Sequence, residues 1–172
     1  TDPTPASGAG PSITFICGCG HSGTTLVANM FAAHPDIFIP LVETEMFLDL
    51  PKAHDRIAAF ERQAVASGKR HVAEKTPRHV YRIPLIRQVM PRARFVVMVR
   101  DGRDIAASFI KRMGSAAAGR ERWLADNRAA MDELGAPDVH LQRYEDLIED
   151  PRAALERICA SCGLAFQPDM SA

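Results

Sequence analysis

Apolar runs and amphipathic stretches follow one another along the chain, as in proteins built from alternating strands and helices. An apolar run at residues 13–16 precedes a group of glycines. After the glycines, apolar residues recur with the spacing of one helix face, at Leu26, Val27, Met30 and Phe31. A second run, at residues 93–99, is continuous, as in parallel strands that are buried on both faces. These patterns predict two central strands and a helix after the first of them.

Further strands and helices fill the intervals between these elements. Short strands are predicted at residues 71–73 and 138–147, and an extended piece follows a turn at residues 34–36. Helices are predicted at residues 51–68, 84–90, 102–113, 116–135 and 151–163. Because strands alternate with helices, we expect an α/β fold of three layers, in which helices flank a central, mainly parallel sheet.

Composition narrows the domain organisation and the range of partners. With 172 residues, 47% of them hydrophobic, we expect one α/β domain at residues 12–172 after a flexible tail at 1–11. The 21 basic residues balance 21 acidic ones, so net charge favours neither a nucleic acid nor an anionic membrane as partner. No run is long enough for a membrane span, and the tail has no signal region. The chain does not begin with Met, so an upstream signal or anchor stays open, as does the oligomeric state.

The four cysteines form two sequence pairs, Cys17 with Cys19 and Cys159 with Cys162. Together, a C-x-C and a C-x-x-C could supply the four ligands of a zinc site. The alternative is buried free thiols, because the second pair shares the apolar stripe of the last predicted helix and the first pair lies where the glycine loop leaves its strand. We expect the free thiols, and with them a cytoplasmic location.

The glycines after the first strand fit two nucleotide-binding patterns. Gly18, Gly20 and Gly23 form G-x-G-x-x-G, the dinucleotide fingerprint, and Glu43 stands about where its ribose-binding acid belongs. Gly18 and Gly23 alone form the G-x-x-x-x-G frame of a P-loop, although Thr24 replaces the lysine of that motif. The letters SGTT place hydroxyl and amide donors at a helix N-terminus, where they suit a dense phosphate charge. A loop without the lysine favours a terminal 5′-phosphate group over a triphosphate with its metal.

A second anion-binding feature follows the apolar run at residues 93–99. Arg100 stands at the carboxyl end of a buried strand, where open α/β sheets bind ligands. Ser108 lies about two turns into the next helix. The two side chains can share one phosphate only if the chain folds back between them, and Asp101–Gly102 predicts such a turn.

These features resemble the sulfotransferases that use 3′-phosphoadenosine 5′-phosphosulfate (PAPS), in the branch that includes carbohydrate and tyrosylprotein sulfotransferases. Over residues 13–165, segments similar to those of the family occur in the same order: GCGHSGTTL, HPDIF, EKTP, VRDGRDIAASF and RYEDLIEDP. The resemblance implies a P-loop nucleotide-binding-like fold and PAPS as the sulfuryl donor, without a bound metal. It also implies transfer to a hydroxyl of a saccharide or another small hydroxylated acceptor.

The resemblance assigns roles to individual residues. Arg100 and Ser108 would hold the 3′-phosphate. Glu43 would take the proton of the acceptor hydroxyl, with Glu45 as the fallback. Lys75, with His21 as a second cation, would neutralise charge on the sulfuryl and leaving phosphate oxygens. The loop residues that would hold the 5′-phosphosulfate are Gly20, His21, Ser22, Gly23, Thr24 and Thr25.

Two departures from the family keep alternatives open. His21 stands where the family usually has Arg or Lys, and an imidazole is largely neutral near pH 7, so we hypothesise that activity falls above neutral pH. The chain also stops at Ala172, short of segments that help close the family's nucleotide site. The alternatives are a P-loop small-molecule kinase, a truncated nucleotide-binding module without turnover and, third, a Rossmann oxidoreductase.

Overall fold

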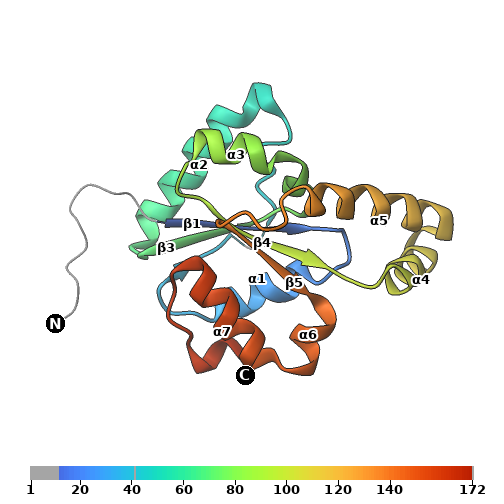
Figure 1. Ribbon diagram of the computed structural model, residues 1–172. Coiled ribbons are helices and arrows are strands. Elements are labelled where there is room, and N and C mark those ends of the chain that lie inside the picture. The colour runs from blue at the N-terminus through green and yellow to red at the C-terminus, as the bar shows by residue number, and fades with distance from the viewer. Residues whose placement is uncertain (1–11, 41, 172) are drawn as a thin grey trace.

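The computed structural model describes residues 12–40 and 42–171, and the tail predicted at residues 1–11 lies outside them. A five-stranded parallel sheet forms the centre of the molecule, in the spatial order β2-β3-β1-β4-β5 (Figure 1). The strands are β1 (Ser12–Gly18), β2 (Ile37–Phe38), β3 (His71–Lys75), β4 (Arg94–Val99) and β5 (Val139–Arg143).

Helices cover both faces of this sheet. They are α1 (Thr24–Ala32), α2 (Leu50–Ser67), α3 (Ile83–Val89), α4 (Gly102–Met113), α5 (Ala116–Met131), α6 (Tyr144–Glu149) and α7 (Pro151–Cys162), with 3₁₀ turns η1 (Pro77–Arg82) and η2 (Pro168–Ser171). In Figure 1, α2, α3 and α5 lie above the sheet and α1, α6 and α7 lie below it. Side chains of β1 alternate between the two interfaces, since Phe15 packs into the upper core and Ile16 into the lower one. The predicted three-layer α/β fold is confirmed.

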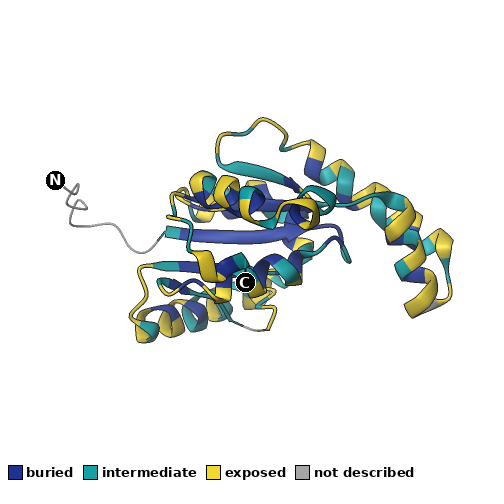
Figure 2. Cartoon of the chain, turned by 90° about the horizontal axis from the view of Figure 1, so that it is seen from below, coloured by how far each residue is buried: buried dark blue, intermediate teal, exposed yellow. Residues whose placement is uncertain are grey.

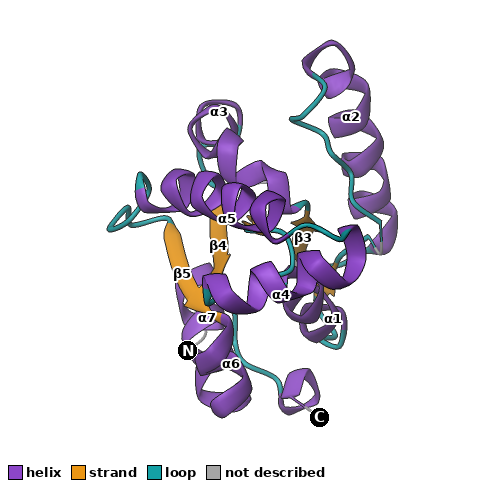
Figure 3. Cartoon of the chain, turned by 90° about the vertical axis from the view of Figure 1, so that its right-hand side faces the viewer, coloured by secondary structure: helices purple, strands orange, loops and turns teal. Residues whose placement is uncertain are grey.

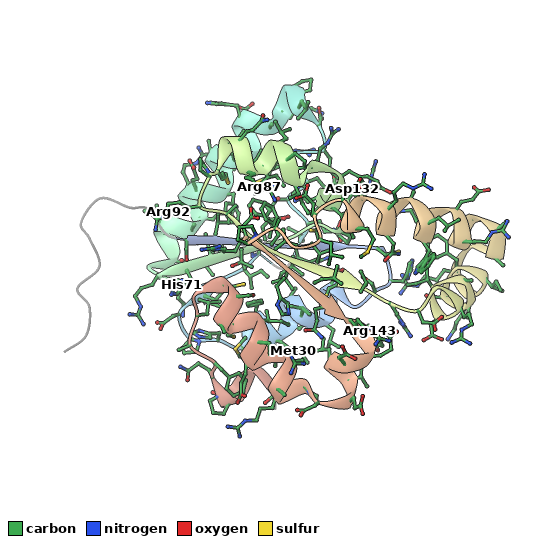
Figure 4. All side chains as sticks on the ribbon, in the orientation of Figure 1. Met30, His71, Arg87, Arg92, Asp132 and Arg143 are labelled. Atoms are coloured by element: carbon green, nitrogen blue, oxygen red, sulfur yellow. The ribbon has the colours of Figure 1, made fainter. Side chains whose placement is uncertain are left out.

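Most predicted elements occur where the sequence placed them, with one clear error. Strand β3 extends to Lys75, beyond the predicted range. The strand predicted at 138–147 ends at Arg143, which Figure 4 labels, and the following residues form α6. The first turn of α6 contains Glu145 and Asp146, whose charges suit a helix N-terminus. The prediction was therefore wrong for the second half of that range.

The order of the strands distinguishes between the two glycine patterns. In the dinucleotide-binding fold, the second strand of the chain lies beside the first, in the order 3-2-1-4-5-6. Here β3 pairs with β1 in that place, and β2 lies at the edge of the sheet. Glu43, which follows β2, is therefore not next to the strand that carries the loop. The dinucleotide interpretation is wrong, and the P-loop-like frame remains.

The backbone of the glycine loop supports the same conclusion. Gly18 has φ +131°, and a Cβ there would lie 2.2 Å from the carbonyl oxygen of Met98. Gly23 has φ +94°, and its Cβ would lie 2.6 Å from the ring of Tyr144. A Cβ on Gly20 would meet no atom within 4 Å. The two glycines that the backbone requires are those of G-x-x-x-x-G.

The four thiols are free and buried, as the sequence indicated. Cys17 packs in the upper core, whereas Cys159 and Cys162 pack in the lower one, so the sheet separates Cys17 from the second pair. Figure 2 shows buried residues along the strands of this sheet. Burial raises the pKa of Cys19 to about 12, and the charge of Asp126 adds to this effect, so its thiol stays protonated.

Neither a metal-binding cluster nor a membrane-spanning helix occurs among the described residues. These residues contain no group of three or more His, Cys, Asp or Glu side chains that could hold a metal ion. No helix among them is both long and apolar enough to cross a membrane. The cytoplasmic location stays a prediction.

An ion-pair cluster holds the connection between α5 and β5 against α3. Arg87 of α3, which Figure 4 labels, donates from Nε to Asp138 and from Nη2 to Glu133, each at 2.7 Å. These hydrogen bonds raise the pKa of Arg87, so the guanidinium remains charged. The connection from α5 to β5 is thereby held against α3.

We predict that Gly18→Ala lowers the free energy of unfolding by at least about 3 kcal/mol, because the methyl group collides with β4 and the positive φ disfavours an L side chain. Gly20→Ala is the control and should change this free energy by less than about 0.5 kcal/mol. Urea unfolding followed by circular dichroism measures both. Equal losses would contradict the assignment of the two required glycines.

Candidate active site at the carboxyl edge of the sheet

The carboxyl ends of four strands bring the candidate residues to one edge of the sheet. The loop at residues 19–23 leaves β1, Lys75 ends β3, Arg100 follows β4 and Tyr144 follows β5. Figure 3 views the molecule from this end, with α4 and α5 in front. Ligands of open α/β sheets bind at this edge, so the residues predicted from the sequence occupy the expected part of the fold.

Hydrogen bonds hold the loop between β1 and α1 in a fixed turn. Ser22 is fully buried, and its hydroxyl donates to the carbonyl oxygens of Cys19 at 2.5 Å and Met98 at 3.2 Å. His21 has φ +67°, which is uncommon for a residue with a side chain. Ser22 therefore shapes the loop from inside. Its direct contact with a phosphosulfate stays a prediction.

A pocket of about 350 Å³ lies against the loop and the first turn of α1. The first N–H groups of a helix have no partner within the helix, and its dipole stabilises anions there. Among the described residues, one arginine lines this pocket and no carboxylate does. Its lining residues are His21, Gly23, Thr24, Thr25, Leu26, Arg100 and Tyr144. The loop and Arg100 thus share one pocket that suits an anion.

Three contacts fix Arg100 beside the loop. Its Nη1 donates to the carbonyl oxygen of His21 at 3.2 Å, and Nη2 lies 3.5 Å from the carboxylate of Asp104. The guanidinium lies over the ring of Tyr144, 4.1 Å from its centroid. Its Nε is buried and has no hydrogen-bond partner among the described residues. Because a buried donor without a partner costs about 1 to 3 kcal/mol, a ligand that accepts from Nε would gain this energy.

His21 joins Arg100 to Ser108. The Nδ1 atom of its ring lies 3.2 Å from the hydroxyl oxygen of Ser108. Burial lowers the pKa of His21, and the cations of Arg112, Arg122 and Arg100 lower it further. In the protein without ligand, the imidazole is therefore neutral at neutral pH. The structure brings both residues predicted for a 3′-phosphate to the glycine loop.

Glu43 and Lys75 form an ion pair, with Nζ of the lysine 2.7 Å from Oε1 of the glutamate. The lysine side chain is 12% exposed and the glutamate side chain 40%, so the carboxylate is the more accessible partner. The fallback acid, Glu45, has its carboxylate 3.8 Å from Arg56 and its backbone at φ +49°. Of the two acids, Glu43 is the one that lies beside the predicted cation.

Sequence reasoning missed Asp126 of α5. Its carboxylate is fully buried and accepts hydrogen bonds from the N–H of Gly20 at 3.3 Å, from Nε of Arg122 at 2.6 Å and from the hydroxyl of Tyr81. These bonds tie the loop to α5 and η1. No local pattern marks Asp126, because 106 residues separate it from Gly20. Tyr144 was also missed, because the strand predicted at 138–147 placed it inside a strand, whereas β5 ends at Arg143.

Comparison with known proteins identifies the family of this chain. The sequence profile of the sulfotransferase family matches residues 12–66 and 52–168. The chain belongs to this family. The nodulation protein NoeE of Sinorhizobium fredii is 26% identical over 216 residues, in a match that covers 92% of this chain. The match covers 51% of NoeE, so this sulfotransferase-family chain spans about half the length of that relative.

Two solved sulfotransferase structures have the same fold. The sulfotransferase domain from the olefin synthase of Synechococcus PCC 7002 aligns with a TM-score of 0.70 at 21% identity, covering 99% of this chain and 80% of that one. The mouse sulfotransferase SULT7A1, in complex with PAP (3′-phosphoadenosine 5′-phosphate), aligns with a TM-score of 0.64 at 17% identity. The alignment covers 95% of this chain and 63% of that one. At these identities the likeness concerns the fold, and it confirms the P-loop-like architecture.

We predict that Asp126→Ala lowers the free energy of unfolding by at least about 3 kcal/mol, because it leaves the Arg122 guanidinium and the Tyr81 hydroxyl without their acceptor. Asp55→Ala is the matched control, since the Asp55 side chain is 91% exposed, and its effect should stay below about 0.5 kcal/mol. Urea unfolding provides both values. A small effect at Asp126 would mean that the loop does not depend on α5.

Proposed function

We propose that this chain transfers a sulfuryl group from PAPS to a hydroxyl of a saccharide or another small hydroxylated acceptor. The observation that carries the proposal is the buried Nε of Arg100 beside the glycine loop, which has no hydrogen-bond partner within residues 12–40 and 42–171. Two anion-binding groups in one place suit a nucleotide with phosphates at both its 5′ and 3′ positions. PAP, 3′-phosphoadenosine 5′-phosphate, is such a nucleotide, and the mouse sulfotransferase of the same fold binds it.

The residues at the carboxyl edge fit the two ends of this donor. Gly23, Thr24 and Thr25 offer the N-terminus of α1 to the 5′ end. Arg100 offers a free Nε to the 3′-phosphate, and the hydroxyl of Ser108, now near His21, can turn to the same group. Thr24 in place of a P-loop lysine disfavours the kinase alternative, because that lysine serves the β- and γ-phosphates.

The acceptor side of the proposal rests on the Glu43–Lys75 pair. When bound, PAPS supplies the sulfuryl group, which leaves the 5′-phosphate oxygen as the acceptor oxygen bonds to sulfur. The partly exposed carboxylate of Glu43 takes the proton of the acceptor hydroxyl. Lys75, whose Nζ lies 2.7 Å from this carboxylate, offers its ammonium to the oxygens on which charge develops.

Calorimetric titration with PAP in EDTA tests the donor site. We predict metal-independent binding that is tighter than binding of ATP or NAD and at least about tenfold weaker in Arg100→Ala, because a charge-assisted hydrogen bond is lost. Arg103→Ala is the control, since this arginine is 91% exposed and paired with Asp101. A preference for Mg-ATP would support the kinase alternative. PAP binding without transfer to any acceptor would support the nucleotide-binding module.

A transfer assay tests the proposed base. With labelled PAPS and a panel of saccharides, small alcohols and tyrosine peptides, Glu43→Gln should lower kcat by about 100-fold to 10,000-fold, because the general base is removed. The affinity for PAP should not change. Glu45→Gln is the matched control, and a larger loss in this variant would assign the base to Glu45 instead.

The pH dependence of PAP binding tests His21. Its pKa is lowered in the free protein, whereas a bound phosphate dianion favours the cation, so binding takes up a proton and should weaken as pH rises from 6 to 8. The phosphates of PAP titrate in the same way with every variant, so the pH profile of the wild-type protein is compared with that of His21→Asn. The asparagine side chain does not titrate, and asparagine tolerates a positive φ. Parallel pH profiles for the two proteins would contradict a charge on His21.

A further inference from the structure

A buried network at the end of β3 contacts the segment that carries Glu43. Its centre is Glu74, whose side chain is completely buried, as is that of its partner His79. One oxygen of the Glu74 carboxylate accepts from the hydroxyls of Thr44 at 2.8 Å and Thr76 at 2.5 Å. The other oxygen accepts from Nδ1 of His79 at 2.9 Å. A buried carboxylate needs such donors, because an unpaired buried charge is strongly destabilising.

The protonation of the network follows from its hydrogen bonds. Burial alone would raise the pKa of Glu74, but the bonds from His79, Thr76 and Thr44 outweigh burial, so the pKa lies below its ordinary value. Glu74 is thus a carboxylate that only accepts. The N–H of Phe47 donates to Nε2 of His79 at 3.3 Å, which places the proton of the neutral ring on Nδ1. The ring also packs edge-on against Phe15 and Phe47, which fixes its orientation.

The network binds the backbone directly after Glu43. The N–H of Thr44 donates to Glu74 at 3.2 Å, that of Glu45 to the Thr76 hydroxyl at 3.2 Å and that of Phe47 to His79. Residues 43–45 belong to neither a helix nor a strand, so no backbone ladder holds them. Side chains at the end of β3 and the start of η1 therefore hold this segment, together with Arg56 of α2, which donates to the carbonyl oxygen of Glu45 at 2.7 Å.

The same strand end carries the partner of the base. Lys75 lies between Glu74 and Thr76 in the chain and pairs with Glu43. We propose that Glu74 and His79 are positioning residues, which hold the Glu43 carboxylate beside Lys75 and the reacting groups. The role rests on the proposed function, in which Glu43 is the base. Neither residue touches the nucleotide pocket, so the network acts on the transfer step and not on donor binding.

The first test measures this pairing without any activity. Acetylation by an N-hydroxysuccinimide ester, followed by mass spectrometry, reports the accessibility of Lys75. Glu43→Gln should increase its rate of modification several-fold by removing the partner. Glu74→Gln and His79→Asn should increase it similarly, with Lys52 as an internal reference because its side chain is 69% exposed. An unchanged rate in both folded network variants, beside an increase in Glu43→Gln, would overturn the proposal.

The second test is a double-mutant cycle on kcat. Glu74→Gln and His79→Asn should each lower kcat by about 10-fold to 100-fold, since small displacements of a reacting group have effects of this size, and should leave PAP affinity unchanged. Added to Glu43→Gln, the same substitutions should cause no further loss. A full additional loss in that background would show a merely structural role. His34→Asn is the matched control, because His34 is also buried but bonds to Ala165 and Asp36.

The two tests separate the two proposals. If the wild-type protein transfers no sulfuryl group to any acceptor, the proposed function fails, whereas the acetylation result still decides whether the network fixes Glu43 beside Lys75. If transfer occurs, but the network variants change the acetylation rate and kcat no more than His34→Asn does, the positioning role fails and the proposed function stands. Glu74→Gln, the milder change, keeps the tests decisive should His79→Asn not fold.

Discussion

The carbonyl oxygen of Met98 is the point on which the arrangement of the site depends. It accepts from the N–H of Cys19 at 3.3 Å and from the hydroxyl of Ser22 at 3.2 Å, and it leaves no space for a side chain on Gly18. The beginning and the middle of the loop are thus tied to one atom of β4. Because Arg100 lies two residues later, directly after this strand, the loop and the arginine are placed by a single piece of backbone.

Much of the fold could be predicted because it depends on local patterns. The buried run of β4 and the capped α7, with Asp150 accepting from the N–H of Ala153 and Gly163 at its end, need only neighbours in sequence. The start of α6 could not be predicted from the sequence, because RYEDL suits either a strand end or a helix start. Strand order was equally out of reach, since it is a property of long connections rather than of any window of residues.

The candidate site divides in the same way. Arg100 could be predicted because it directly follows a buried strand, and Glu43 and Lys75 by their resemblance to family motifs. The roles of Glu74 and Asp126 could not, because they consist of contacts with distant segments: Gly20 lies 106 residues from its acceptor, and Phe47 lies 32 residues from His79. The choice between Glu43 and Glu45 likewise required their partners. Sequence reasoning found the groups that are proposed to contact a ligand and missed the groups that hold them in place.

His21 touches both halves of the proposed nucleotide site, through its carbonyl to Arg100 and through its ring to Ser108. The two proposed phosphate positions are therefore not independent modules. A substitution that adapts the loop at this point also alters the surroundings of the other phosphate, so combined mutations in the two halves will be non-additive. In the proposed donor site, adaptation to a nucleotide without a 3′-phosphate therefore has to change both ends together and requires a new arrangement at position 21.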